Sequence, residues 1–186
     1  MLLAGCSGQS NLECNTFEGN YSGSVQYEDK QYNRNGFSGA TKYLPVRYAT
    51  VDLLDDAGNI VALGKTDSYG KFSISANNAC NVRVISATDG TQSQLIEVQN
   101  MDQQLFAVVQ SIQKSDSSQI NIEIPLSSPA SGAFNILDVL TYGGDFVYAF
   151  QGVYPLKMIA NWEENNSYGT GFCSANMLCE NGEGLY

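Results

Sequence analysis

The chain has 186 residues, of which 43% are hydrophobic, and its formal net charge is -10. This length suits one complete domain and part of a second, because domains usually run about 100–200 residues. The negative charge repels nucleic acid and anionic membrane surfaces, so we exclude nucleic acid as a partner. The sequence contains no histidine, which removes the commonest general base near neutral pH and the commonest metal ligand.

The first residues contain the motif Leu3-Ala4-Gly5-Cys6, followed by a small polar stretch over 7–11. The motif resembles the bacterial lipobox, which implies that Cys6 is lipidated and anchors an exported protein to the outer membrane or cell surface. Two or more acyl chains hold stably, since each buried methylene contributes about 0.8 kcal/mol. The basic and apolar regions that precede a lipobox are missing, so we expect the start to be truncated. We assign 1–16 to lipobox and tether; the alternative is a chance apolar start with a buried cysteine.

Four cysteines remain if Cys6 is acylated, and four allow three pairings. The simplest choice is a local bridge between Cys173 and Cys179, which leaves Cys14 to pair with Cys80. The second bridge would close a long loop, worth about 4 kcal/mol on the chain-entropy description. Disulfides need an oxidising compartment, in agreement with export. Zinc is the competing interpretation, but zinc ligands normally lie two to four residues apart with histidine nearby.

Between residues 20 and 125, short β-prone runs alternate with polar turns rich in Gly and Asx, a pattern typical of a sandwich. Alternation of apolar and polar residues is clearest in 82–85 and 121–124. We therefore expect a mainly β chain, with an immunoglobulin- or transthyretin-like β-sandwich over 17–127. The candidate strands are 21–28, 46–54, 60–66, 71–75, 81–87, 94–98, 104–111 and 119–124.

The sequence changes character at a Pro/Ser/Gly linker over 126–132. Apolar residues at roughly helical spacing then predict one amphipathic helix over 133–150, with Ser131 as N-cap and with Gly143 and Gly144 weakening it. A strand is expected over 155–162, and two short ones over 169–173 and 184–186. We expect 128–186 to be an incomplete α+β segment that starts a C-terminal domain.

Two motifs of the sandwich region are Pro45-Val46-Arg47-Tyr48-Ala49-Thr50-Val51 and Thr66-Asp67-Ser68-Tyr69-Gly70-Lys71-Phe72. Together they resemble the carboxypeptidase-regulatory-like (transthyretin-like, Cna B-like) sandwich. The physics of the second motif fits that fold: Asp67 can cap the turn, Gly70 can adopt a positive φ, and Phe72 returns to the core. The resemblance implies a fold but little about function, because such modules serve as stalks, spacers and accessory domains.

A second resemblance covers Ser131-Gly132-Ala133-Phe134-Asn135-Ile136-Leu137-Asp138-Val139, the strand 155–162 and the turn at Gly169-Thr170. These segments look like the lead-in to the zinc-metallopeptidase domain of bacterial exported proteins. In that family the His-Glu-x-x-His motif comes only later. Because this chain has no histidine, the resemblance carries no catalytic residue onto it and implies only the non-catalytic front of a surface peptidase.

Three groups of side chains invite a functional interpretation, and each has a plainer one. Four aspartates could bind calcium at one end of the sandwich, but Asp and Gly are also what polar hairpins need. The neighbouring Glu163 and Glu164 would point to opposite faces of a strand, so a solvated turn is favoured over paired catalytic carboxylates. Five tyrosines could stack on sugars, or pack within the sheets. The aspartates are Asp52, Asp55, Asp56 and Asp67, and the tyrosines are Tyr21, Tyr27, Tyr32, Tyr43 and Tyr48.

The sequence thus predicts a non-catalytic, lipid-anchored module of the cell envelope that positions or supports a downstream domain. One alternative is the truncated N-terminal part of an exported zinc metallopeptidase. Another is an adhesin or carbohydrate-binding module. We expect no cofactor and no metal for this chain, and an envelope protein or a glycan as the partner besides the membrane.

Overall fold

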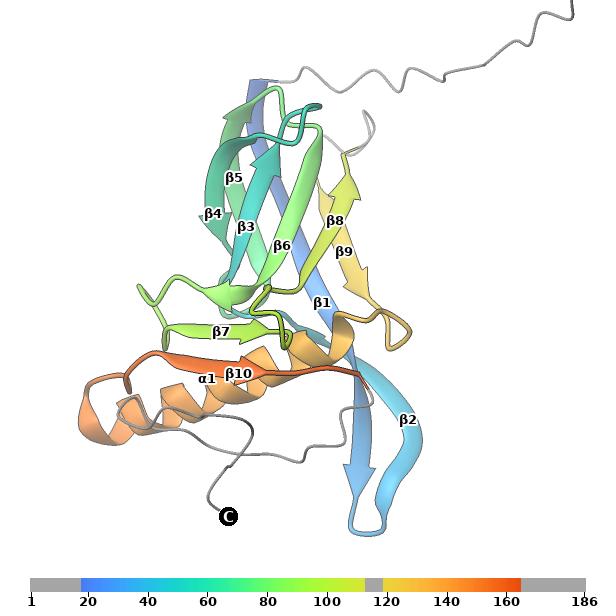
Figure 1. Cartoon of the computed structure of the whole chain (residues 1–186), viewed down its shortest axis with the longest axis vertical. Coiled ribbons are helices and arrows are strands. Elements are labelled where there is room, and N and C mark those ends of the chain that lie inside the picture. The colour runs from blue at the N-terminus through green and yellow to red at the C-terminus, as the bar shows by residue number, and fades with distance from the viewer. Residues whose placement is uncertain (1–17, 113–118, 165–186) are drawn as a thin grey trace, which may run out of the picture.

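The computed structural model describes residues 18–112 and 119–164 (Figure 1). These residues form ten strands and one helix, so the expected mainly β fold, followed by a helix and a strand, is confirmed. The elements are β1 (Glu18–Asn33), β2 (Gly36–Pro45), β3 (Ala49–Leu54), β4 (Ile60–Lys65), β5 (Lys71–Asn77), β6 (Asn81–Thr88), β7 (Ile96–Gln99), β8 (Ala107–Ser111), β9 (Ile120–Ile124), α1 (Ser131–Gln151) and β10 (Met158–Asn161).

The strands form two sheets that enclose an apolar core. The first has the order β2-β1-β5, with β9 also paired to β1. The second has the order β10-β7-β6-β3-β4, with β8 also paired to β6. Both sheets are mixed, because β9 pairs with β1 and β10 pairs with β7 in parallel while the other pairs are antiparallel.

Alternating burial explains why several strands are visible in the sequence. β9 buries Ile120, Ile122 and Ile124 and exposes the two residues between them. β6 buries Val82 and Val84 in the same way. Successive side chains of a strand point to opposite faces, so this period of two places one face against the core.

The turn between β4 and β5 has the expected geometry. The Asp67 carboxylate accepts hydrogen bonds from the backbone amides of Tyr69 at 2.8 Å and Lys71 at 2.9 Å. Gly70 adopts a φ of 72°, where a Cβ would lie 2.5 Å from the carbonyl oxygen of Val25. Phe72 then returns to the core with 4% of its surface exposed. The capping, the positive φ and the core return predicted for this turn are confirmed.

Strand β2 is absent from the predicted strands. β1 runs on to Asn33, beyond the expected end at Glu28, and pairs with β2 in an antiparallel hairpin. Figure 1 shows this hairpin projecting beyond the sandwich at the end where α1 lies. Eight of the ten β2 residues are exposed, so β2 lacks the apolar alternation that reveals a strand.

Helix α1 differs from its prediction at the first turn. Its N-cap is Ala130, without a side-chain capping bond, so the prediction of Ser131 as N-cap was wrong. Ser131 lies inside the helix, and its hydroxyl donates to the carbonyl of Glu28 at 3.4 Å. The helix continues through Gly143 and Gly144 because packing outweighs their low helix propensity.

Helix α1 and β10 pack against the sandwich. Phe134 and Leu137 belong to the same buried cluster as the core residues of the two sheets. β10 extends the second sheet, and Trp162 after it donates its backbone N–H to Gln99 at 2.8 Å. The predicted domain boundary at 127 stays a prediction.

Candidate interaction surface

The four aspartates considered for calcium do not meet. Asp52 is 2% exposed and binds Arg83, with 2.8 Å between Oδ2 and Nε. Asp55 and the neighbouring Asp56 lie in the turn before β4, and Asp67 lies in the turn after it. The six residues of β4 span roughly 20 Å, so the two turns are at opposite ends of this strand.

Two of the three turn carboxylates, those of Asp55 and Asp67, form hydrogen bonds within their own turns. The side chain and backbone amide of Asn59 donate to Asp55 at 2.9 and 2.8 Å, and these hydrogen bonds lower the pKa of Asp55. Asp67 caps the next turn, as described above. Within residues 18–112 and 119–164, no three His, Cys, Asp or Glu side chains are grouped to hold a metal ion. The arrangement agrees with polar hairpins rather than a calcium site.

Of the five cysteines, only Cys80 lies within the described residues, where it is 7% exposed and directly precedes β6. Cys6, Cys14, Cys173 and Cys179 lie outside them. Lipidation and the disulfide pairing therefore stay predictions. The short strands expected over 169–173 and 184–186 also lie outside the described residues.

The tyrosines divide between core and surface. Tyr21 and Tyr27 are each 1% exposed, whereas Tyr32 and Tyr43 are exposed on the β1–β2 hairpin. Tyr48 is half-buried with a φ of 56°. The five thus form no common face. Glu163 and Glu164 are both exposed after β10, as expected for a solvated turn.

An ion-pair network attaches α1 to the sandwich. The Arg47 Nε lies 2.6 Å from Asp138 Oδ1, and its Nη1 lies 3.3 Å from Asp145 Oδ2. Arg47 also donates to the backbone carbonyl of Asp138 at 3.2 Å. The fork geometry of a guanidinium fixes direction as well as distance. These contacts join two segments about 90 residues apart and orient the helix on the core.

Tyr27 joins the same network from the core. Its hydroxyl donates to Asp138 Oδ2 at 3.0 Å while its ring is buried in the core. Burial and the neighbouring Asp138 carboxylate raise the pKa of Tyr27 well above its usual value of 10.0. The phenol therefore stays neutral and remains a donor throughout the physiological range.

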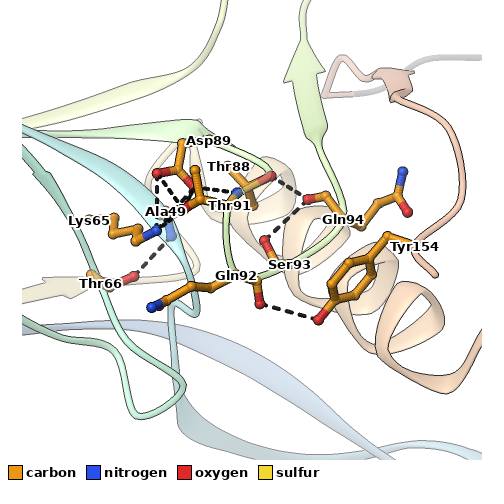
Figure 2. Close-up of polar contacts among 10 residues, drawn as sticks. All are labelled: Ala49, Lys65, Thr66, Thr88, Asp89, Thr91, Gln92, Ser93, Gln94 and Tyr154. Atoms are coloured by element: carbon orange, nitrogen blue, oxygen red, sulfur yellow. Dashed lines mark hydrogen bonds and ion pairs between the residues drawn. The ribbon is translucent and has the colours of Figure 1, made fainter. Parts of the chain in front are cut away.

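The loop between β6 and β7 contacts the chain at the C-terminal end of α1, as Figure 2 shows. Tyr154, just after the helix, donates its hydroxyl to the carbonyl of Gln92 at 3.2 Å. The buried Gln94 donates to the carbonyl of Leu156. On the opposite side of the loop, the Lys65 ammonium lies 3.1 Å from Asp89. The loop thus links the segment after α1 to the second sheet.

The side of α1 that faces away from the sandwich carries four apolar residues, which we call the outer face. Val139, Tyr142, Phe146 and Phe150 are 60%, 68%, 59% and 76% exposed. Phe146 and Phe150 also contact each other, with ring centroids 4.8 Å apart. Scattered exposed apolar residues are ordinary, but a row along one element marks an interaction surface. The outer face is the candidate functional site.

The sequence prediction missed this face, although a signal for it exists. At 3.6 residues per turn, Phe146 and Phe150 lie across the helix from Phe134 and Leu137. Counting all apolar residues of 133–150 as one stripe hides this separation. An angular projection of the same residues would have revealed a helix that is apolar on two sides.

Comparison with known proteins leaves the family open. No family model matches the sequence, and no curated protein matches it. A 9R-lipoxygenase from Cyanothece PCC8801 is a structural neighbour at 13% sequence identity and a TM-score of 0.32. The match covers 74% of this chain but 25% of the lipoxygenase, so the chain spans about a quarter of that protein's length. A likeness this weak supports no argument about fold or function.

The described part of the chain holds no helix that is both long and apolar enough to cross a membrane.

Proposed function

We propose that this chain is a non-catalytic, lipid-anchored module of the bacterial cell envelope that holds a following domain away from the membrane. The main support is the placement of the chain's entry and exit. β1 begins at the end of the sandwich opposite to α1, and the described chain stops beside α1 (Figure 1). From Glu18 to Tyr27, which contacts α1, β1 rises roughly 30 Å. A tether at one end and a continuing chain at the other suit a spacer.

The rigid attachment of α1 also favours this proposal. A spacer must transmit position, and Arg47, Tyr27 and the loop around Gln94 fix the helix against the sandwich.

Membrane fractionation of the chain, expressed in a bacterial host behind a signal peptide for lipoprotein export, tests the anchor. The parent protein is expected in the membrane fraction with metabolically incorporated palmitate. Cys6→Ser is expected to move it to the soluble fraction without label. Cys14→Ser is the matched control and should stay in the membrane. A Cys6→Ser protein that keeps the label and the membrane location would contradict the proposal.

Glycan binding is a second candidate function, favoured by the aromatic residues of the projecting hairpin. Tyr32 and Phe37 are 69% and 50% exposed, with ring centroids 5.9 Å apart. Exposed rings of this kind can stack on sugars. A glycan array probed with the full chain tests this candidate. Binding that disappears in Tyr32→Ser but persists in Tyr69→Ser, an exposed tyrosine in the β4–β5 turn, would support it.

A further inference from the structure

The outer face of α1 is uncharged as well as exposed. Over Ser131–Gln151 the only ionisable acids or bases besides tyrosine are Asp138 and Asp145, and both bind Arg47 on the side toward the sandwich. A helix that is apolar around its circumference is normally buried on all sides. The outer face therefore lacks the polar surface of a helix that faces water.

Gly143 lies within this face, and no contact among the described residues requires a glycine at this position. A Cβ at Gly144 would come within 2.7 Å of the Gln94 side chain, so packing against the β6–β7 loop requires that glycine. A Cβ at Gly143 would meet nothing within 4 Å. Because glycine in a helix costs about 1 kcal/mol relative to alanine, its presence here suits a segment that approaches the helix backbone closely.

We propose that residues 165–186 of this chain cover the outer face of α1. This inference goes beyond the spacer function and does not depend on the lipid anchor. The described chain leaves β10 beside the first turn of α1, where a Cβ on Gly132 would lie 2.3 Å from the Trp162 ring. The 22 residues after Glu164 can reach up to roughly 70 Å, more than twice the roughly 31 Å length of α1.

The composition of 165–186 also suits the outer face. The segment carries the apolar residues Tyr168, Phe172, Met177 and Leu178. Its only charged side chains are Glu180 and Glu183, which meet no like charge on the outer face. Apolar burial can therefore drive docking without an electrostatic penalty.

Area favours a tethered segment over a second molecule. The four residues of the outer face expose roughly 450 Å², because an aromatic side chain offers about 150–250 Å² and the three aromatic ones are 59–76% exposed. Two copies meeting here would bury roughly 900 Å² in total, below the about 1,200 Å² at which stable interfaces between free molecules begin. A segment of the same chain binds at millimolar effective concentration and needs less area. A net charge of -10 also disfavours an anionic membrane as the occupant.

Limited proteolysis of the purified full chain with chymotrypsin tests the proposal, with cleavage after Tyr168 and Phe172 followed by mass spectrometry. The double variant Phe146→Ala/Phe150→Ala is expected to raise this cleavage rate about 5- to 30-fold, because cleavage follows the population of the undocked segment. Gly143→Leu, which adds bulk to the same face, is expected to raise it as well. Phe37→Ala, in the β1–β2 hairpin, is the control and should leave the rate unchanged. An unchanged unfolding temperature would show that the variants fold.

Three results would overturn the proposal. The first is cleavage after Tyr168 and Phe172 that is as fast in the parent chain as in the α1 variants. The second is sedimentation of the parent as a dimer and of the double variant as a monomer, which would assign the face to a second copy. The third is flotation of the parent, but not of the double variant, with phosphatidylcholine vesicles. These assays use the full chain expressed without lipidation of Cys6. Their outcome is therefore separable from that of the fractionation test.

Discussion

The two sides of α1 are both apolar, but they differ in what contacts them. The inner side packs Phe134 and Leu137 into the core, and beside it Asp138 and Asp145 bind Arg47. The outer face repeats large apolar residues, and its side chains make no polar contact with the other described residues that would fix an orientation. The inner side is thus built for one fixed geometry, and the outer face for coverage by apolar atoms. Hydrophobicity alone does not distinguish the two, whereas the surrounding charges and glycines do.

The largest expected difference between the two sides comes from removing a phenyl ring on each. Phe134 is fully buried, so Phe134→Ala should lower the free energy of unfolding by about 3–5 kcal/mol through lost burial and a cavity. Phe146→Ala on the outer face should lower it by less than about 1 kcal/mol. Urea denaturation of both variants measures the contrast. Equal losses would mean that the outer face is part of the core.

The Arg47 network should give the next largest effect. Arg47→Met leaves the Asp138 carboxylate, with 18% of its side chain exposed, without its cation and is expected to cost about 2–3 kcal/mol. Lys65→Met removes the more exposed pair with Asp89 and should cost at most about 1 kcal/mol. Chemical denaturation compares them. If the Lys65 variant lost more stability than the Arg47 variant, the network would not be what holds α1.

Adjacent glycines give a matched pair on the two sides. Gly144→Ala forces a methyl group against the Gln94 side chain and should destabilise the protein by about 1–3 kcal/mol. Helix propensity alone would make Gly143→Ala stabilising by up to about 1 kcal/mol, since no described atom lies within 4 Å of the added methyl group. A segment docked closely on the outer face should remove that gain and make the variant destabilising by up to about 1 kcal/mol. Thermal unfolding of the two variants tests the sign. A destabilising Gly143→Ala would indicate close backbone contact on the outer face.

Alkaline pH should lower the free energy of unfolding through Tyr27, by less than the substitutions above do. The pKa of Tyr27 is raised in the folded protein, so above the unfolded value of 10.0 the unfolded chain releases this proton while the native state keeps it. Stability due to this group is therefore complete below pH 10 and falls as the pH rises, by about 1 kcal/mol at pH 11. Tyr27→Phe should remove that part of the decline. Denaturation curves of both proteins at pH 9 and 11 that stay parallel would contradict the assignment.

The predictable parts of the fold are those whose cause is local. The turn around Gly70 follows from an Asx side chain and a residue that tolerates positive φ, and β9 from its isoleucine alternation. β2 escaped prediction because most of its residues face solvent and its pairing depends on the long β1. The Arg47–Asp138 pair joins residues 91 positions apart, for which no local pattern exists.

The candidate site was only partly accessible from the sequence. The helix itself is visible in its apolar spacing, but the direction of each face depends on where Arg47 and Gln94 fix it. The aspartates illustrate the opposite case, since their proximity in sequence left a cluster open that β4 separates in the structure. In both cases three-dimensional placement, rather than residue type, decides the role.

Amide hydrogen exchange, followed by mass spectrometry on the full chain, tests most directly whether α1 is a fixed part of the sandwich. The account predicts that amides of 131–151 exchange as slowly as those of the buried strands β3 and β6, because the helix opens only when the common core unfolds. Helix amides that exchange orders of magnitude faster than those strands would contradict it, since α1 would then be a separately unfolding unit.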